Sequence, residues 1–224
     1  MVRILFKSAA FIFAFLFFAS IVFAQSSKHD AFQVKVTGKG QPIIFIPGAT
    51  CGGDEWDATV AHLVGRYQCH VLTLAGYAGT PALAKGPYLE TMRKQISQYI
   101  DDNHLEHVIL IGHSIGGYLS LYLASEMKDH LEKIFVVDAM PFFAGAQNPK
   151  APDTFSESQA QKMLAMYNNL DDNALKTYQF NTARFLCRDS TYWDKIATWG
   201  RSVRPEDNGI YHDRNVGWRY PKAH

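Results

Sequence analysis

The sequence predicts an α/β fold with a mostly parallel, doubly wound sheet. Two observations predict it: short apolar runs alternate with stretches of helical periodicity, and one apolar run ends in a glycine-rich turn that opens an apolar helix. The 224 residues, 47% of them hydrophobic, suffice for one domain with a buried core. The formal net charge of +1, without a basic stripe interleaved with aromatic residues, argues against a nucleic-acid partner.

Residues 1–24 have the pattern of a signal peptide. Arg3 and Lys7 precede an almost wholly apolar stretch, and Val22-Phe23-Ala24 fits a small-residue cleavage site. We expect cleavage after Ala24, export to the periplasm or the outside of the cell, and no stable membrane anchor afterwards. An uncleaved anchor is the alternative, although the apolar run is short for a full membrane span.

Residues 25–140 are expected to form the core. Alternation predicts a strand at 32–36, and a continuous apolar run predicts a strand covered on both faces at 42–46. Further strands are expected at 69–74, 108–111 and 134–137. Apolar residues at helical spacing predict helices after Asp54, which we expect to be an N-cap, and at 88–103 and 118–124. Functional sites of parallel sheets lie at the carboxyl ends of the strands, where this chain has Ala49, Gly76, Ser114 and Asp138.

The glycine-rich turn is Gly112-His113-Ser114-Ile115-Gly116-Gly117. A G-x-S-x-G between a strand and a helix is the pattern of a nucleophile elbow, in which a strained turn exposes the serine hydroxyl. Gly112 and Gly116 have no Cβ, so the strand and helix backbones can approach closely. The N–H of Ile115, at the helix N-terminus, is then placed to bind an oxyanion. An ordinary glycine-rich turn is the alternative interpretation.

The pattern changes after Pro141, and residues 141–200 are predicted to form a helical lid. Helical stretches are expected at 156–168, 172–185 and 190–199, the first opened by a capping box of Ser156 and Gln159.

Four segments together resemble the α/β-hydrolase family: Ile43–Gly48, Leu74–Gly79, the Gly112–Gly117 turn and Phe135–Asp138. The resemblance covers roughly residues 32–140. It implies Ser114 as the nucleophile, the N–H groups of Ala49 and Ile115 as the oxyanion hole, and no cofactor or metal. It also implies Asp138 as the acid, since some family members place the acid at the end of this strand. The alternative is that Asp138 only caps a turn.

Family members continue past the lid with two more strands, and the loop after the second carries the base histidine. No apolar strand follows Trp199 here, and His212 and His224 lie in a polar tail. We therefore expect a chain truncated at its C-terminus, without the last strands of the sheet. Residues 201–224 lose helical periodicity, and our hypothesis is an out-of-frame tail; an unusual but genuine C-terminus is the alternative.

The function these residues predict is an exported serine hydrolase that cleaves an ester, thioester or amide of a small, partly apolar acyl substrate. The alternative is a degenerate, non-catalytic binding protein or an inactive truncated product, since a serine without a base is a poor nucleophile. A carbon–halogen or carbon–carbon hydrolase is disfavoured, because dehalogenase members have Asp where Ser114 stands.

The chain has three cysteines, Cys51, Cys69 and Cys187. Because the number is odd, at least one of them is unpaired in an exported protein. One disulfide remains an alternative. We favour the interpretation that these cysteines are small buried hydrophobic residues, because no spacing of His and Cys residues fits a metal site.

We predict that the mature chain begins at Gln25. Intact-mass spectrometry of protein from the exported fraction should show the loss of residues 1–24. A retained Met1 in that fraction would indicate a membrane anchor instead.

Overall fold

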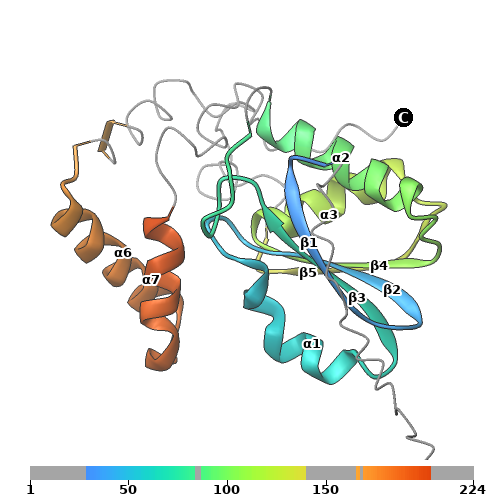
Figure 1. Cartoon of the computed structure of the whole chain (residues 1–224), viewed down its shortest axis with the longest axis horizontal. Coiled ribbons are helices and arrows are strands. Elements are labelled where there is room, and N and C mark those ends of the chain that lie inside the picture. Colours follow the sequence, from blue (N-terminus) through green and yellow to red (C-terminus); the bar gives the residue numbers. More distant parts are fainter. Residues whose placement is uncertain (1–28, 84–86, 140–164, 167–168, 203–224) are drawn as a thin grey trace, which may run out of the picture.

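The computed structural model describes residues 29–83, 87–139, 165–166 and 169–202 (Figure 1). Its centre is a five-stranded sheet of order β1-β3-β2-β4-β5. The strands β2 (Gln41–Ile46), β3 (Tyr67–Leu74), β4 (Val108–His113) and β5 (Leu131–Val137) are parallel, and β1 (Phe32–Gly38) pairs antiparallel with β3. The mostly parallel sheet is therefore confirmed.

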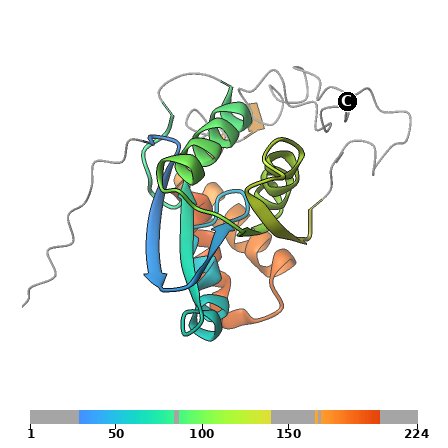
Figure 2. The same cartoon turned by 90° about the vertical axis from the view of Figure 1, so that its right-hand side faces the viewer.

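Helices cover both faces of this sheet (Figures 1 and 2). The short α1 (Asp57–Leu63) lies on one face, and α2 (Tyr88–Asp102) and α3 (Ile115–Glu126) lie on the other. Beyond the sheet come α6 (Asp172–Leu186), the 3-10 turn η2 (Ser190–Tyr192) and α7 (Trp193–Arg201). None of the helices in the described ranges is long and apolar enough to cross a membrane.

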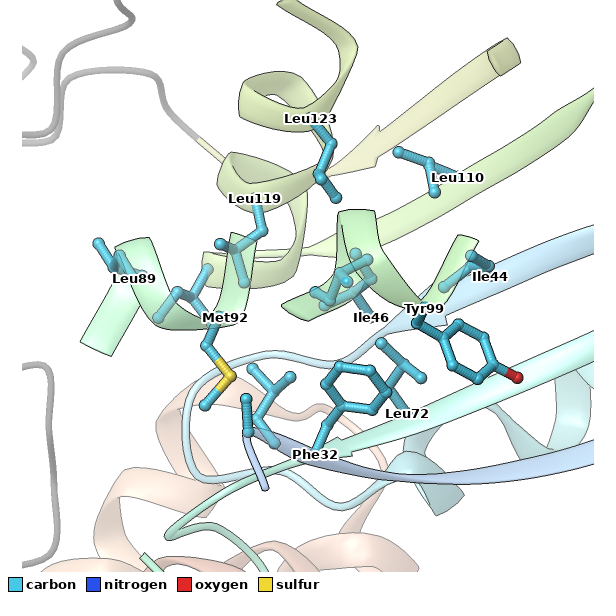
Figure 3. Close-up of a cluster of buried hydrophobic side chains, with 14 of the residues drawn as sticks. Phe32, Ile44, Ile46, Leu72, Leu89, Met92, Tyr99, Leu110, Leu119 and Leu123 are labelled. Carbon is cyan, nitrogen blue, oxygen red and sulfur yellow. The ribbon is translucent and has the colours of Figure 1, made fainter. Parts of the chain in front are cut away.

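The core has two parts because successive residues of a strand point to opposite faces. In β2, Ile44 and Ile46 belong to the larger cluster with α2 and α3, whereas Ile43 and Phe45 pack with Trp56 on the α1 side. Figure 3 shows the larger cluster, in which Leu and Met side chains of the helices meet Ile and Leu side chains of the strands. The continuous apolar run of β2 is thus explained by burial on both faces.

The expectation for Asp54 is wrong. Residues Gly53–Trp56 form a 3-10 turn, η1, and α1 begins only at Asp57 with Trp56 as its N-cap. The N–H of Glu55 bonds the carbonyl oxygen of Gly52 at 3.1 Å, which closes the 3-10 turn. The Asp54 carboxylate instead forms an ion pair with Lys195 of α7, with 2.9 Å between Oδ2 and Nζ.

The other core elements occur where the sequence predicts them, and the strands and the helix after Ser114 have longer bounds. The helix after Ser114 begins at Ile115 rather than at residue 118, and β5 begins at Leu131 rather than at 134. These elements are longer because their backbone hydrogen bonds continue beyond the apolar residues from which they were predicted. Helices α6 and α7 match the predicted stretches 172–185 and 190–199, apart from the start of the latter in η2. The signal peptide, the Ser156–Gln159 capping box and residues 203–224 lie outside the described residues.

Strand β5 lies at the edge of the sheet that the described residues form, and three of its apolar side chains are exposed. Phe135 is 51% exposed, Val137 45% and Val136 37%. The run 134–137 is therefore a strand, as predicted, but its side chains are not buried on both faces as those of β2 are.

The close contact between β4 and α3 gives a stability prediction. A Cβ on Gly112 would overlap the carbonyl oxygen of Gly116 and lie 2.5 Å from the buried Ser120 Oγ. Gly112→Ala should therefore lower the free energy of unfolding by about 1–3 kcal/mol, the usual cost of overpacking. Gly65→Ala is the matched control, since a Cβ there meets no atom within 4 Å. Equal urea midpoints for the two variants would contradict the prediction.

The buried His70 gives a pH prediction. Its Nδ1 lies 2.7 Å from the Tyr99 hydroxyl, and burial lowers the pKa of His70 to about 4. Below the ordinary pKa of about 6.5 the unfolded chain binds a proton that the folded chain does not take up. Stability should therefore fall by something on the order of 3 kcal/mol as the pH drops from about 6.5 to 4.

Denaturant unfolding at several pH values measures this loss. His70→Gln should flatten the slope in that interval, whereas His62→Gln, on the exposed surface of α1, should keep the wild-type slope. An unchanged slope in His70→Gln would show that another group causes the acid destabilisation.

Candidate active site

Ser114 stands at the junction between β4 and α3 in a strained backbone conformation. Its φ is 50° and its ψ is −116°, and it is the N-cap residue of α3. Positive φ is unfavourable for a residue with a Cβ, so the surrounding contacts must hold it. They include the Ser114 N–H, which donates to the carbonyl oxygen of Val137 at 2.9 Å, and the Tyr118 N–H, which donates to the Ser114 carbonyl at 3.0 Å.

The contact between glycines makes this sharp turn feasible. A Cβ on Gly112 would overlap the Gly116 carbonyl, and a Cβ on Gly116 would lie 2.7 Å from the Pro47 carbonyl oxygen. The first turn of α3 therefore packs directly on the end of β4 and on the end of β2. Among the twenty residues, glycine alone permits such an approach.

The register of the sheet brings Ala49 and Ile115 to the same edge. Ile46 of β2 is paired with Gly112 of β4, so both strands end at the same level. The segment that follows β2, residues 47–56, therefore runs beside the turn that contains Ser114. Ala49 lies in this 47–56 segment, and Ile115 is the first residue of α3.

Asp138 follows β5 directly, with a φ of 45° and an exposed side chain. It lies close enough to His113 for its charge to raise the pKa of that imidazole. The structure thus places Asp138 at the same edge of the sheet as Ser114, on the neighbouring strand end.

Sequence reasoning missed Glu55. One of its carboxylate oxygens accepts a hydrogen bond from the Gly48 N–H at 2.9 Å, and the other forms an ion pair with Nδ1 of His113. The hydrogen bond that the Glu55 carboxylate accepts from His113, together with the charges of Glu55 and Asp138, raises the pKa of His113 against the opposing effect of desolvation. No signal in the sequence joins residues 55 and 113, because only the pairing of β2 with β4 brings them together.

Within the described residues, no hydrogen bond joins Ser114 Oγ to a histidine. His70 is engaged with Tyr99 and Gln68 in the core, and His113 is engaged with Glu55. His212 and His224 lie outside the described residues.

Helix α7 contacts the 47–56 segment. Lys195 Nζ lies 2.9 Å from Asp54 Oδ2, and it also lies 5.0 Å from the ring centroid of Trp199. One residue of the predicted lid therefore contacts the segment that contains Ala49.

The three cysteines are free, with Cys69 buried and Cys51 and Cys187 half-buried. Burial and the charges of Glu55 and Asp54 raise the pKa of the Cys51 thiol far above its ordinary value, so Cys51 is not a thiolate. The described ranges contain no group of three or more His, Cys, Asp or Glu side chains that could hold a metal ion.

Solved structures share this fold. An esterase from Exiguobacterium antarcticum aligns with a TM-score of 0.67 and 17% identity, covering 84% of this chain and 70% of its own. An enol-lactonase from Burkholderia xenovorans aligns with a TM-score of 0.65 and 15% identity, covering 85% of this chain and 75% of its own. At these identities the likeness shows the fold alone.

A curated relative is the pimeloyl-[acyl-carrier protein] methyl ester esterase of Vibrio atlanticus. It is 29% identical over 120 residues, which are 54% of this chain and 45% of the relative. The chain therefore spans less than half the length of this relative.

The family model of the α/β hydrolase fold matches residues 41–192, which is more than half of the chain. This stretch includes β2, β4, the turn at Ser114 and all of α6. The chain belongs to the α/β hydrolase fold family.

Proposed function

We propose that this protein is a serine hydrolase that cleaves a carboxylic ester of a small, partly apolar acyl group. The observation that carries the proposal is Ser114, held at positive φ between β4 and the N-terminus of α3. A strained serine at this junction is the geometry of a nucleophile elbow. The match to a methyl ester esterase supports esters over thioesters or amides.

In the proposed reaction, Ser114 Oγ attacks the acyl carbon and gives up its proton to a base. The N–H groups of Ala49 and Ile115 stabilise the negative oxygen of the tetrahedral intermediate. The alcohol leaves with a proton, and the acyl group remains on Ser114. Water then attacks the acyl-enzyme, releases the carboxylic acid and restores the serine hydroxyl.

Asp138 is the proposed acid partner of the base, because it follows β5 directly and stands at the same edge of the sheet as Ser114. The negative charge of Asp138 raises the pKa of His113, which supports an electrostatic role for Asp138 at this edge. An imidazolium that forms when a histidine accepts the serine proton is stabilised by such a carboxylate.

A second candidate is a binding protein that keeps the site without the chemistry. It is favoured by the observation that, over the described ranges, His70 and His113 are engaged elsewhere and Ser114 Oγ bonds no histidine. This candidate shares the Ser114 turn but lacks a proton acceptor, so it predicts binding of acyl compounds without turnover.

We further propose that α6 and α7 belong to a lid over this edge, attached through the ion pair of Lys195 and Asp54. Export after cleavage at Ala24 completes the proposal and rests on residues 1–24 alone.

The first experiment replaces the proposed nucleophile. Ser114→Ala should abolish the hydrolysis of p-nitrophenyl acetate and labelling by a fluorophosphonate, because both need the hydroxyl. Ser125→Ala is the matched control: this serine lies on the same helix, and its Oγ donates to the Tyr122 carbonyl at 2.7 Å, away from the turn. It should keep both activities, and far-UV circular dichroism should be unchanged in both variants.

Equal rates of ester hydrolysis for the wild type and Ser114→Ala would contradict the assignment of Ser114 as the nucleophile. A wild type that neither hydrolyses the ester nor reacts with the probe, but binds a short-chain acyl ligand in calorimetry, would favour the second candidate.

A further inference from the structure

The 47–56 segment contains the proposed oxyanion donor Ala49, so its position decides whether that donor can act. Its later part is anchored by the Gly53 N–H, which donates to Thr73 Oγ1 at 2.9 Å, and by the ion pair of Asp54 with Lys195. Its first part is held by bonds within the segment. The Cys51 N–H donates to the Gly48 carbonyl at 3.2 Å, which forms a turn around Ala49, and the Gly48 N–H donates to Glu55 Oε2 at 2.9 Å. The Glu55 carboxylate therefore links the end of the segment to Gly48 at its start.

The same carboxylate also connects this segment to the neighbouring strand. Its second oxygen pairs with Nδ1 of His113, the residue that immediately precedes Ser114. The contact is close on the backbone side as well: a Cβ on Gly48 would lie 2.7 Å from His113 Nδ1 and 3.1 Å from its Cε1. The imidazole is thus enclosed between the Gly48 backbone and the Glu55 carboxylate.

We infer that Glu55 is a positioning residue, whose carboxylate fixes the 47–56 segment and its Ala49 amide against the Ser114 turn by binding the Gly48 N–H and His113 together. The inference rests on the proposed function, since it assigns Glu55 a part in holding the proposed oxyanion hole. Glu55 itself touches no reacting atom and acts through Gly48 and His113.

Burial makes this link stronger than an ion pair on the surface. The Glu55 side chain is 19% exposed and that of His113 is 30% exposed, so solvent screens the pair only in part. Two carboxylates act on the imidazole, Glu55 directly and Asp138 through its charge, and both raise the pKa of His113. The charged pair therefore persists above the ordinary pKa of histidine and weakens as the pH rises through the raised pKa.

Two variants of Glu55 separate its two bonds. Glu55→Gln keeps an oxygen for the Gly48 N–H but loses the charge that stabilises protonated His113. Glu55→Ala loses both. Asp57→Asn is the control, because it removes a carboxylate two residues away, on the exposed surface of α1.

The full-length variants should be compared in ester hydrolysis and in NMR. We expect kcat/KM for p-nitrophenyl acetate to fall about 10- to 100-fold in Glu55→Ala, mainly through kcat, because a displaced oxyanion donor weakens transition-state binding. Glu55→Gln should retain more activity than Glu55→Ala, with a changed dependence on pH. NMR titration should show a lowered His113 pKa in both Glu55 variants and faster amide exchange at Gly48 in Glu55→Ala. Asp57→Asn should match the wild type in every measurement.

An unchanged His113 pKa in Glu55→Gln, or wild-type kcat and Gly48 exchange in Glu55→Ala, would overturn the inference. The NMR readouts do not depend on catalysis. If the wild type hydrolyses no ester, the proposed function fails, whereas the His113 pKa and Gly48 exchange still decide whether Glu55 fixes the segment.

Discussion

The contact between the backbones of β4 and α3 is the constraint on which the site depends. Gly112 meets the Gly116 carbonyl with no room for a side chain on either residue, and this lets a strand turn into a helix at Ser114. The strain of a positive φ at Ser114 is held by bonds to Val137 and Tyr118. A larger residue at Gly112 or Gly116 would force the helix away and release that strain.

The sheet supplies the second condition, because it fixes where the neighbouring segments end. The pairing of Ile46 with Gly112 brings the end of β2 to the level of the Ser114 turn. This pairing is supported by burial on both faces, with Ile44 and Ile46 on the α2 and α3 side and Ile43 and Phe45 on the α1 side. Packing in the core thus determines that the 47–56 segment, rather than another loop, lies beside Ser114.

The sequence predicts those features that a local pattern determines. Alternating and continuous apolar runs predict the strands, and the glycine spacing around Ser114 predicts the turn, because these signals depend on burial and on backbone geometry. The N-cap at Asp54 is wrong because a 3-10 turn precedes α1 and because Asp54 pairs with Lys195, which is 141 residues away. The contact between Glu55 and His113 was not predictable, since it joins η1 to the end of β4, which only the strand register makes neighbours.

The site divides into a part made by the backbone and a part made by side chains. The Ser114 turn and the Ile115 N–H follow from β4 and α3, whereas in our inference the position of the Ala49 N–H also depends on the Glu55 carboxylate. Proton transfer needs a base of suitable pKa within hydrogen-bond reach of the hydroxyl, and no part of the backbone framework provides it. The hydrolase and the non-catalytic binding protein would therefore share one framework and differ only in a proton acceptor. Because that framework is independent of the base, proton transfer at this site depends on side chains rather than on the fold.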